Sequence, residues 1–91
     1  MKLRYTLPAL IELESILDFI AARSPQGAAN VKARIKAVTG LLLTHPHIGV
    51  ATDDASIRRA KANPYPYLIF YEPRDEEIII HSIRHGARKG N

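Results

Sequence analysis

The residues of this sequence best equipped for chemistry are the cations and a histidine of its C-terminal half. Guanidinium and ammonium groups bind phosphate, and imidazole can transfer a proton near neutral pH. Such a set can hold an anionic partner or, with a suitable acid and base, take part in phosphodiester cleavage. They are the candidate target-binding residues, and the candidate catalytic residues if the chain is a ribonuclease: Arg58, Arg59, Lys61, Arg84, His85 and Arg88.

The distribution of charge favours an anionic partner without identifying one. The 91 residues include 13 Lys and Arg against 9 Asp and Glu, which gives a net charge of +4. Between Phe19 and Thr52 there are four cations and no acid. A basic surface attracts nucleic acid, a ribosome or an acidic protein segment. Ordinary basic proteins carry similar charge, so charge alone selects none of these partners.

Several classes of site are excluded or disfavoured by what the sequence lacks. It contains no cysteine, so disulfides, thiolate nucleophiles and cysteine-ligated metals are excluded. His45 and His47 flank Pro46 without further metal ligands, so we expect no metal and no cofactor. Residues 1–6 lack the apolar stretch of a secretory signal, and the aliphatic runs are too short to cross a bilayer. A cytoplasmic protein is therefore expected.

The elements that must position these residues follow from periodicity and helix signals. A strand is expected over residues 2–7, and Pro8 suits the first turn of a helix. Ser24 followed by Pro25 predicts the start of a second helix, which should end before Pro46. Two helices with so short a link form an antiparallel hairpin. Neither helix can bury its apolar face alone, so both are expected to pack on a sheet.

Three strands are expected to complete the fold, over residues 57–62, 65–72 and 77–84. In the second of these, Tyr67 and Tyr71 share one face while Leu68 and Phe70 share the other. The third is largely apolar on both faces, which indicates a central strand or one that is partly covered on both sides. The order β-α-α-β-β-β predicts an α+β fold, with the N-terminal strand and the two-helix hairpin packed on a small antiparallel sheet, as a single domain over residues 1–91.

Short motifs follow one another along almost the whole chain. They are Ala9, Glu12-Leu13, Pro25, Leu42…Pro46…Gly49, Arg58-Arg59, Pro66-Tyr67-Leu68-Ile69-Phe70-Tyr71, Ile78-Ile79-Ile80-His81-Ser82-Ile83 and His85-Gly86-Ala87-Arg88. In this order and spacing they resemble the RelE/ParE toxin superfamily, the plasmid-stabilisation toxins of type II toxin–antitoxin systems. The closing His-Gly-Ala-Arg is similar to the ParE branch. The resemblance implies a helical hairpin on an antiparallel sheet.

The branches of this superfamily differ in their targets. RelE-like toxins cleave messenger RNA on the ribosome with strand Lys and Arg residues, an Arg in the aromatic strand and commonly a late Tyr. Here Leu68 stands where that Arg is expected, and no tyrosine follows Tyr71. The resemblance therefore implies a ParE-like toxin that inhibits DNA gyrase by binding and is not an enzyme. The alternatives are a RelE-like ribosome-dependent endoribonuclease and a degenerate, non-toxic member.

The resemblance also implies a hetero-oligomer with a cognate antitoxin, whose acidic amphipathic segment folds on binding. The candidate antitoxin-binding residues are Leu10, Leu13, Leu17, Tyr67 and Tyr71. For the tyrosines, packing within the sheet is the stronger alternative, and stacking on RNA bases is a further one. On an ideal strand His81 and His85 would point to the same face, either as structural residues or as proton carriers.

Overall fold

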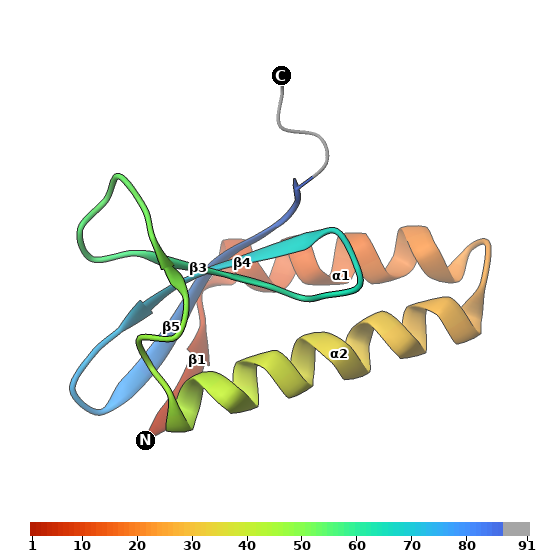
Figure 1. Ribbon diagram of the computed structural model, residues 1–91. Coiled ribbons are helices and arrows are strands. Elements are labelled where there is room, and N and C mark those ends of the chain that lie inside the picture. Colours follow the sequence, from red (N-terminus) through yellow and green to blue (C-terminus); the bar gives the residue numbers. More distant parts are fainter. Residues whose placement is uncertain (87–91) are drawn as a thin grey trace.

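The structure, a computed structural model, describes residues 1–86 (Figure 1). Its elements are β1 (Lys2–Tyr5), α1 (Leu7–Ala21), α2 (Pro25–Thr44), β2 (Val50–Ala51), β3 (Arg58–Lys61), β4 (Tyr67–Pro73) and β5 (Glu77–His85). This order confirms the expected α+β architecture and adds the two-residue strand β2. Arg88, one of the candidate site residues, lies outside the described residues.

The second helix begins where the sequence predicts. The first begins at Leu7, which was expected to belong to the first strand, because the Thr6 side chain caps the helix and ends the strand at Tyr5. The Thr6 hydroxyl accepts a hydrogen bond from the Ala9 backbone N–H at 3.2 Å, and the Ser24 hydroxyl accepts one from Gly27 at 2.9 Å. Each cap satisfies a backbone donor that has no partner within the helix. α2 ends just before Pro46, as expected. The two helices form the antiparallel hairpin seen in Figure 1, and no helix within residues 1–86 combines the length and apolar character of a membrane span.

The five strands form one sheet in the order β1-β5-β4-β3-β2. All neighbouring pairs are antiparallel except β1 and β5, which are parallel. The expected sheet was purely antiparallel, so this part of the prediction was wrong. The helical hairpin and three strands separate β1 from β5 along the chain. β1 therefore pairs with β5 without a hairpin turn, at the edge of the sheet opposite β2, and can run in the same direction. β5 lies between β1 and β4, which was one of the two predicted alternatives for this strand, and this position explains why Ile78, Ile79 and Ile80 are all buried.

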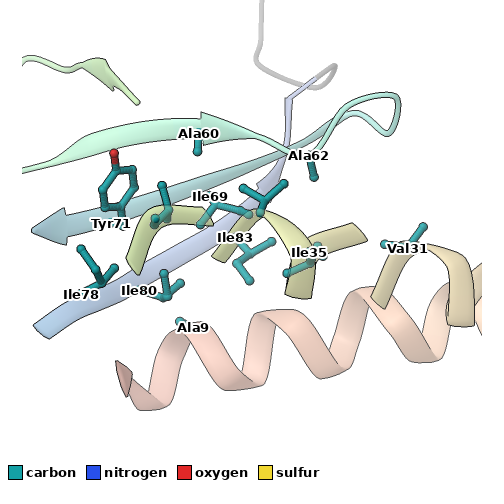
Figure 2. Close-up of a cluster of buried hydrophobic side chains, with 12 residues drawn as sticks. Ala9, Val31, Ile35, Ala60, Ala62, Ile69, Tyr71, Ile78, Ile80 and Ile83 are labelled. Carbon is teal, nitrogen blue, oxygen red and sulfur yellow. The ribbon is translucent and has the colours of Figure 1, made fainter. Parts of the chain in front are cut away.

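The core lies between the helical hairpin and one face of the sheet (Figure 2). Its members are Ala9, Val31, Ile35, Val38, Leu42, Ala60, Ala62, Ile69, Tyr71, Ile78, Ile80 and Ile83. Apart from Ala9, the helical members all come from α2. α1 adds partly buried residues such as Leu13 and Leu17. The predicted alternation along β4 is confirmed. Ile69 and Tyr71 face the helices, so Leu68 and Phe70 lie on the opposite, open face of the sheet.

A β-bulge in β5 changes which side chains share a face. Phe70 of β4 pairs with Ser82, but the next residue, Tyr71, pairs with Ile80, so His81 is an extra residue in β5. The extra residue shifts the alternation by one position. His81 therefore lies on the open face, while His85 lies on the helix side opposite Tyr67. The expectation that the two histidines share a face was wrong, because it assumed an unbroken strand.

Candidate functional site

Three of the predicted target-binding cations lie together on the open face of the sheet. Lys61 of β3 is paired with Leu68 of β4, and Leu68 is paired with Arg84 of β5. These residues form a row across three strands with a cation at each end. Adjacent strands are about 4.8 Å apart, so the outer Cα atoms are separated by roughly 10 Å. Arg59 occupies the neighbouring row, opposite Phe70.

We call Arg59, Lys61 and Arg84, with Leu68 and Phe70 between them, the basic sheet face. The three cations are exposed, and none forms an ion pair within residues 1–86. Arg84 is partly positioned, because its Nε donates to the Ser82 hydroxyl at 2.9 Å and its guanidinium lies 5.5 Å from the Phe70 ring centre. The face can therefore bind an anionic surface without first breaking an internal salt bridge.

Arg58 occupies a different environment from its neighbour Arg59. It is paired with Tyr71, on the helix side of β3. Its Nη1 donates to the backbone carbonyl of Gly49 at 2.7 Å and to that of His47 at 3.3 Å. Arg58 thus holds the loop between α2 and β2. The alternation of a strand already separates consecutive arginines onto opposite faces, but the sequence does not reveal these carbonyl partners.

His85 is also separated from the basic sheet face. Its ring packs edge-on against Tyr67 with 5.3 Å between ring centres. Because it follows Arg84 directly in a regular part of β5, it points to the helix side and does not join Arg84 on the open face. The roles of Arg58 and His85 in target binding stay predictions, but the structure gives both residues a packing role.

The candidate antitoxin-binding residues differ in how much surface they present. Tyr71 has no exposed surface, so in this conformation it cannot contact a partner. Its hydroxyl accepts from the Gly49 N–H at 2.9 Å and donates to the Pro46 carbonyl at 2.8 Å. Burial raises the pKa of Tyr71 above 10.0. Tyr67, Leu13 and Leu17 are partly buried against the core, whereas Leu10 is 44% exposed.

The sequence reasoning missed a histidine–carboxylate pair on the open face. His81 Nε2 lies 2.9 Å from Glu72 Oε1, and the other oxygen of this carboxylate lies 3.6 Å from Arg74 Nε. The pair borders a shallow hollow that is also lined by Ser82 and Arg84. A carboxylate can orient an imidazole for proton transfer. The two residues are nine positions apart on paired strands, so only the strand register could have revealed them. No cluster suited to a metal ion occurs in the part of the chain that the structure describes.

A groove between α2 and the β2–β3 edge was missed as well. Its apolar lining includes three large side chains that the isolated chain leaves exposed, and its lining also contains three cations. These six residues are Leu41, Ile48, Val50, Arg34, Arg59 and Lys61. The apolar members belong to a helix end, a loop and a two-residue strand, so no single periodic pattern marks them.

The sequence of this chain is similar to those of known proteins. Residues 3–90 match the family described as ParE toxin of type II toxin-antitoxin system, parDE. The chain is 36% identical over 85 residues to Toxin RelE2 of Caulobacter vibrioides, covering 92% of this chain and 93% of that protein. It is 35% identical over 79 residues to Putative toxin Y4kP of Sinorhizobium fredii, covering 86% and 82%.

A solved structure of the chromosomal ParDE TA system from P. aeruginosa has the same fold, with a TM-score of 0.79. The match covers 93% of this chain and 95% of that chain at 20% sequence identity. This likeness supports the architecture described above. Since the family match spans nearly the whole sequence, the chain belongs to the ParE toxin family of type II toxin–antitoxin systems.

Proposed function

We propose that this toxin inhibits DNA gyrase by binding to it, and that a cognate antitoxin neutralises it. Membership of the ParE family supports a toxin paired with an antitoxin. The Lys61–Leu68–Arg84 row is the observation that favours inhibition by binding over catalysis. Such a row provides two separated cations around an apolar centre. This arrangement suits attachment to an anionic surface, such as a protein or its bound DNA.

The apolar centre of the row also has a structural partner. A Cβ added at Gly86 would lie 3.1 Å from Leu68 Cγ, so the backbone after β5 passes close to Leu68. Leu68 therefore helps to fix the end of β5 beside Arg84. At the position where the RelE-like pattern expects an arginine, this chain has a residue that packs and cannot stabilise a phosphate.

A ribosome-dependent endoribonuclease is the second candidate, and the His81–Glu72 pair favours it. On this alternative His81 would take the proton of a ribose 2′-hydroxyl, and Arg84 would stabilise the charge on the attacked phosphate. The bond from the 2′-oxygen to phosphorus would form as the bond to the 5′-oxygen breaks, and the leaving 5′-oxygen would take a proton from the protonated His81 or from water. Both residues line the same hollow. Gyrase and the ribosome are both cytoplasmic, so either candidate places the protein in the cytoplasm.

The gyrase proposal is tested by a supercoiling assay with purified gyrase and relaxed plasmid. We expect the toxin to inhibit supercoiling, and Arg59→Ala with Lys61→Ala to weaken inhibition by about 10-fold or more, because two cations of the basic sheet face are lost. The matched control, Lys32→Ala with Lys36→Ala, removes the same charge from the exposed side of α2 and should inhibit like the wild type.

The endoribonuclease is tested in cells that express the toxin, by mapping messenger RNA ends and plasmid supercoiling after induction. Ribosome-dependent cleavage that His81→Asn abolishes, with unaffected supercoiling, would replace the gyrase proposal with the second candidate. Normal growth in the absence of antitoxin, with neither effect, would indicate a non-toxic member of the family.

A further inference from the structure

The outer face of α1 is apolar at its N-terminal end and acidic at its C-terminal end. Leu7, Ile11, Glu14 and Asp18 follow one another at helical intervals, so their side chains share one side of the helix. We call these four residues the α1 outer face. Leu7 and Ile11 are 69% and 56% exposed, and Leu10 beside them is 44% exposed. Both acids are exposed as well, and neither forms an ion pair within residues 1–86. Large aliphatic side chains left together in water are typical of an interaction surface.

The groove between α2 and the β2–β3 edge carries the opposite charge. Arg34 and Leu41 both line it from α2, and Ile48 and Val50 extend its apolar part beyond the end of that helix. Leu41, Ile48 and Val50 are 45%, 55% and 59% exposed. Two cations of β3 add to its positive charge, and none of the acids that the structure describes lines it. The groove is therefore apolar and basic, whereas the α1 outer face is apolar and acidic.

The two surfaces also match in spacing. An α-helix rises about 1.5 Å per residue, so positions seven apart are separated by about 10 Å along its axis. Ile11 precedes Asp18 by seven residues, and Arg34 precedes Leu41 by seven. The order is apolar then acidic on α1, and basic then apolar on α2. When two such helices lie antiparallel, Ile11 meets Leu41 and Asp18 meets Arg34. When they lie parallel, each charge meets an aliphatic side chain, so the pattern selects the antiparallel arrangement.

These two surfaces do not meet within one molecule. α1 packs against α2 and β5, whereas the groove lies on the side of α2 that borders β2 and β3. The residues that face solvent on both surfaces are exposed in the single chain, so neither surface covers the other. A complementary partner for the α1 outer face is thus present on every other copy of this protein.

From this complementarity we infer that the α1 outer face of one copy binds the groove of a second copy, so that the free toxin associates with itself. Aliphatic side chains meet at one end of the contact, and Asp18 pairs with Arg34 at the other. The contact is heterologous, since it joins different surfaces of the two copies, and it leaves one α1 outer face and one groove free. Further copies can therefore add, in an open chain or a closed ring. This inference does not rest on the proposed function.

The strength of this association is limited by its size and by the charge of the whole chain. Few side chains take part, so we expect a dissociation constant of about 10–100 µM. Each copy also has a net charge of +4, which opposes association. At about 0.15 M salt the screening length is about 8 Å, so repulsion between distant charges is reduced more than attraction within the contact. The association is therefore measured at this ionic strength.

Sedimentation velocity of the purified toxin, over concentrations that bracket this constant, tests the inference. The average mass of the wild type should rise with concentration. Asp18→Arg and Arg34→Asp should each weaken association about 10-fold or more, because each places two like charges face to face. Both side chains are exposed, and neither forms an ion pair within residues 1–86. Both variants should therefore keep the urea midpoint of the wild type, which shows that they fold.

The two substitutions combined in one chain provide the strongest comparison. The charges are then exchanged between the two surfaces, so association should return to within about threefold of the wild type. Lys32→Asp is the matched control for Arg34→Asp, since Lys32 is an exposed α2 residue that does not line the groove, and it should associate like the wild type. A wild type that stays monomeric at every concentration overturns the inference. So does association that the single substitutions leave unchanged or that the combined substitutions fail to restore. Gyrase inhibition is measured separately, so either result leaves the proposed function standing.

Discussion

The hydroxyl of Tyr71 connects the core of the sheet to the loop that follows α2. The side chain is fully buried, and its hydroxyl bonds to the Gly49 N–H and the Pro46 carbonyl at 2.9 and 2.8 Å. The fit is close, because a Cβ at Gly49 would lie 2.7 Å from this oxygen and 2.8 Å from the Arg59 carbonyl. Tyr71→Phe keeps the ring and removes both hydrogen bonds.

The loss of folding free energy in Tyr71→Phe comes from two backbone groups, the Gly49 N–H and the Pro46 carbonyl, that lose their hydrogen-bond partner. A neutral hydrogen bond contributes about 0.5–1.5 kcal/mol, and leaving a buried partner unsatisfied costs about 1–3 kcal/mol. Both partners are backbone groups of one loop, and they are only partly buried because Pro46 and Gly49 are not in the core. We therefore expect a loss of about 2–3 kcal/mol in the free energy of unfolding.

Urea denaturation of the isolated toxin, followed by circular dichroism, measures this loss. The midpoint should fall while the slope of free energy against urea stays unchanged, because the surface exposed on unfolding is the same. Tyr65→Phe is the matched control, since this half-buried tyrosine makes no side-chain hydrogen bond within residues 1–86, and it should change stability by less than about 0.5 kcal/mol. Equal effects of the two substitutions would refute the reasoning.

Three further predictions concern α2, β3 and the edge of the sheet. Gly40→Ala should stabilise the protein by about 0.5–1 kcal/mol, seen as a higher urea midpoint, because Gly40 lies inside α2 and an added Cβ meets nothing within 4 Å. Arg58→Ala should cost about 1–2 kcal/mol, since it frees the carbonyls of the α2–β2 loop, whereas exposed Arg59→Ala should stay within about 0.5 kcal/mol in the same experiment. The hydrogen bond from Arg4 lowers the pKa of Glu77 below 4.5, so its contribution is fully present above that pH and is lost as the pH falls through the folded-state pKa. Thermal midpoints of the wild type and Glu77→Gln should accordingly converge as the pH falls below 4.5, and a constant difference across the acid range would contradict this.

The helical half of the fold was predictable because its signals are local. Pro8, Ser24 and Pro46 each act on a backbone within a few residues of themselves, so their effect can be judged from sequence alone. The strand faces of β4 were predictable for the same reason, because side chains alternate along any regular strand.

The errors concern relations between distant segments. The parallel pairing of Lys2–Tyr5 with β5 depends on where the chain returns after more than 70 residues, which no local pattern specifies. The bulge at His81 arises from the register between β4 and β5, and it places His81 and His85 on opposite faces of the sheet. The Glu72–His81 pair and the carbonyl contacts of Arg58 depend on the same kind of long-range pairing.

The loop between α2 and β2 connects the stability of this toxin to the groove between α2 and the β2–β3 edge. Tyr71 and Arg58 both hold this loop, from β4 and β3, through backbone groups of Pro46, His47 and Gly49. The same loop contains Ile48, which lines the groove between α2 and the β2–β3 edge. The Tyr71 hydroxyl and the Arg58 guanidinium therefore fix the shape of the groove, although neither side chain lines it. A loss of partner binding after a change at Arg58 is for this reason no evidence of direct contact, because the substitution also alters the loop that forms the groove.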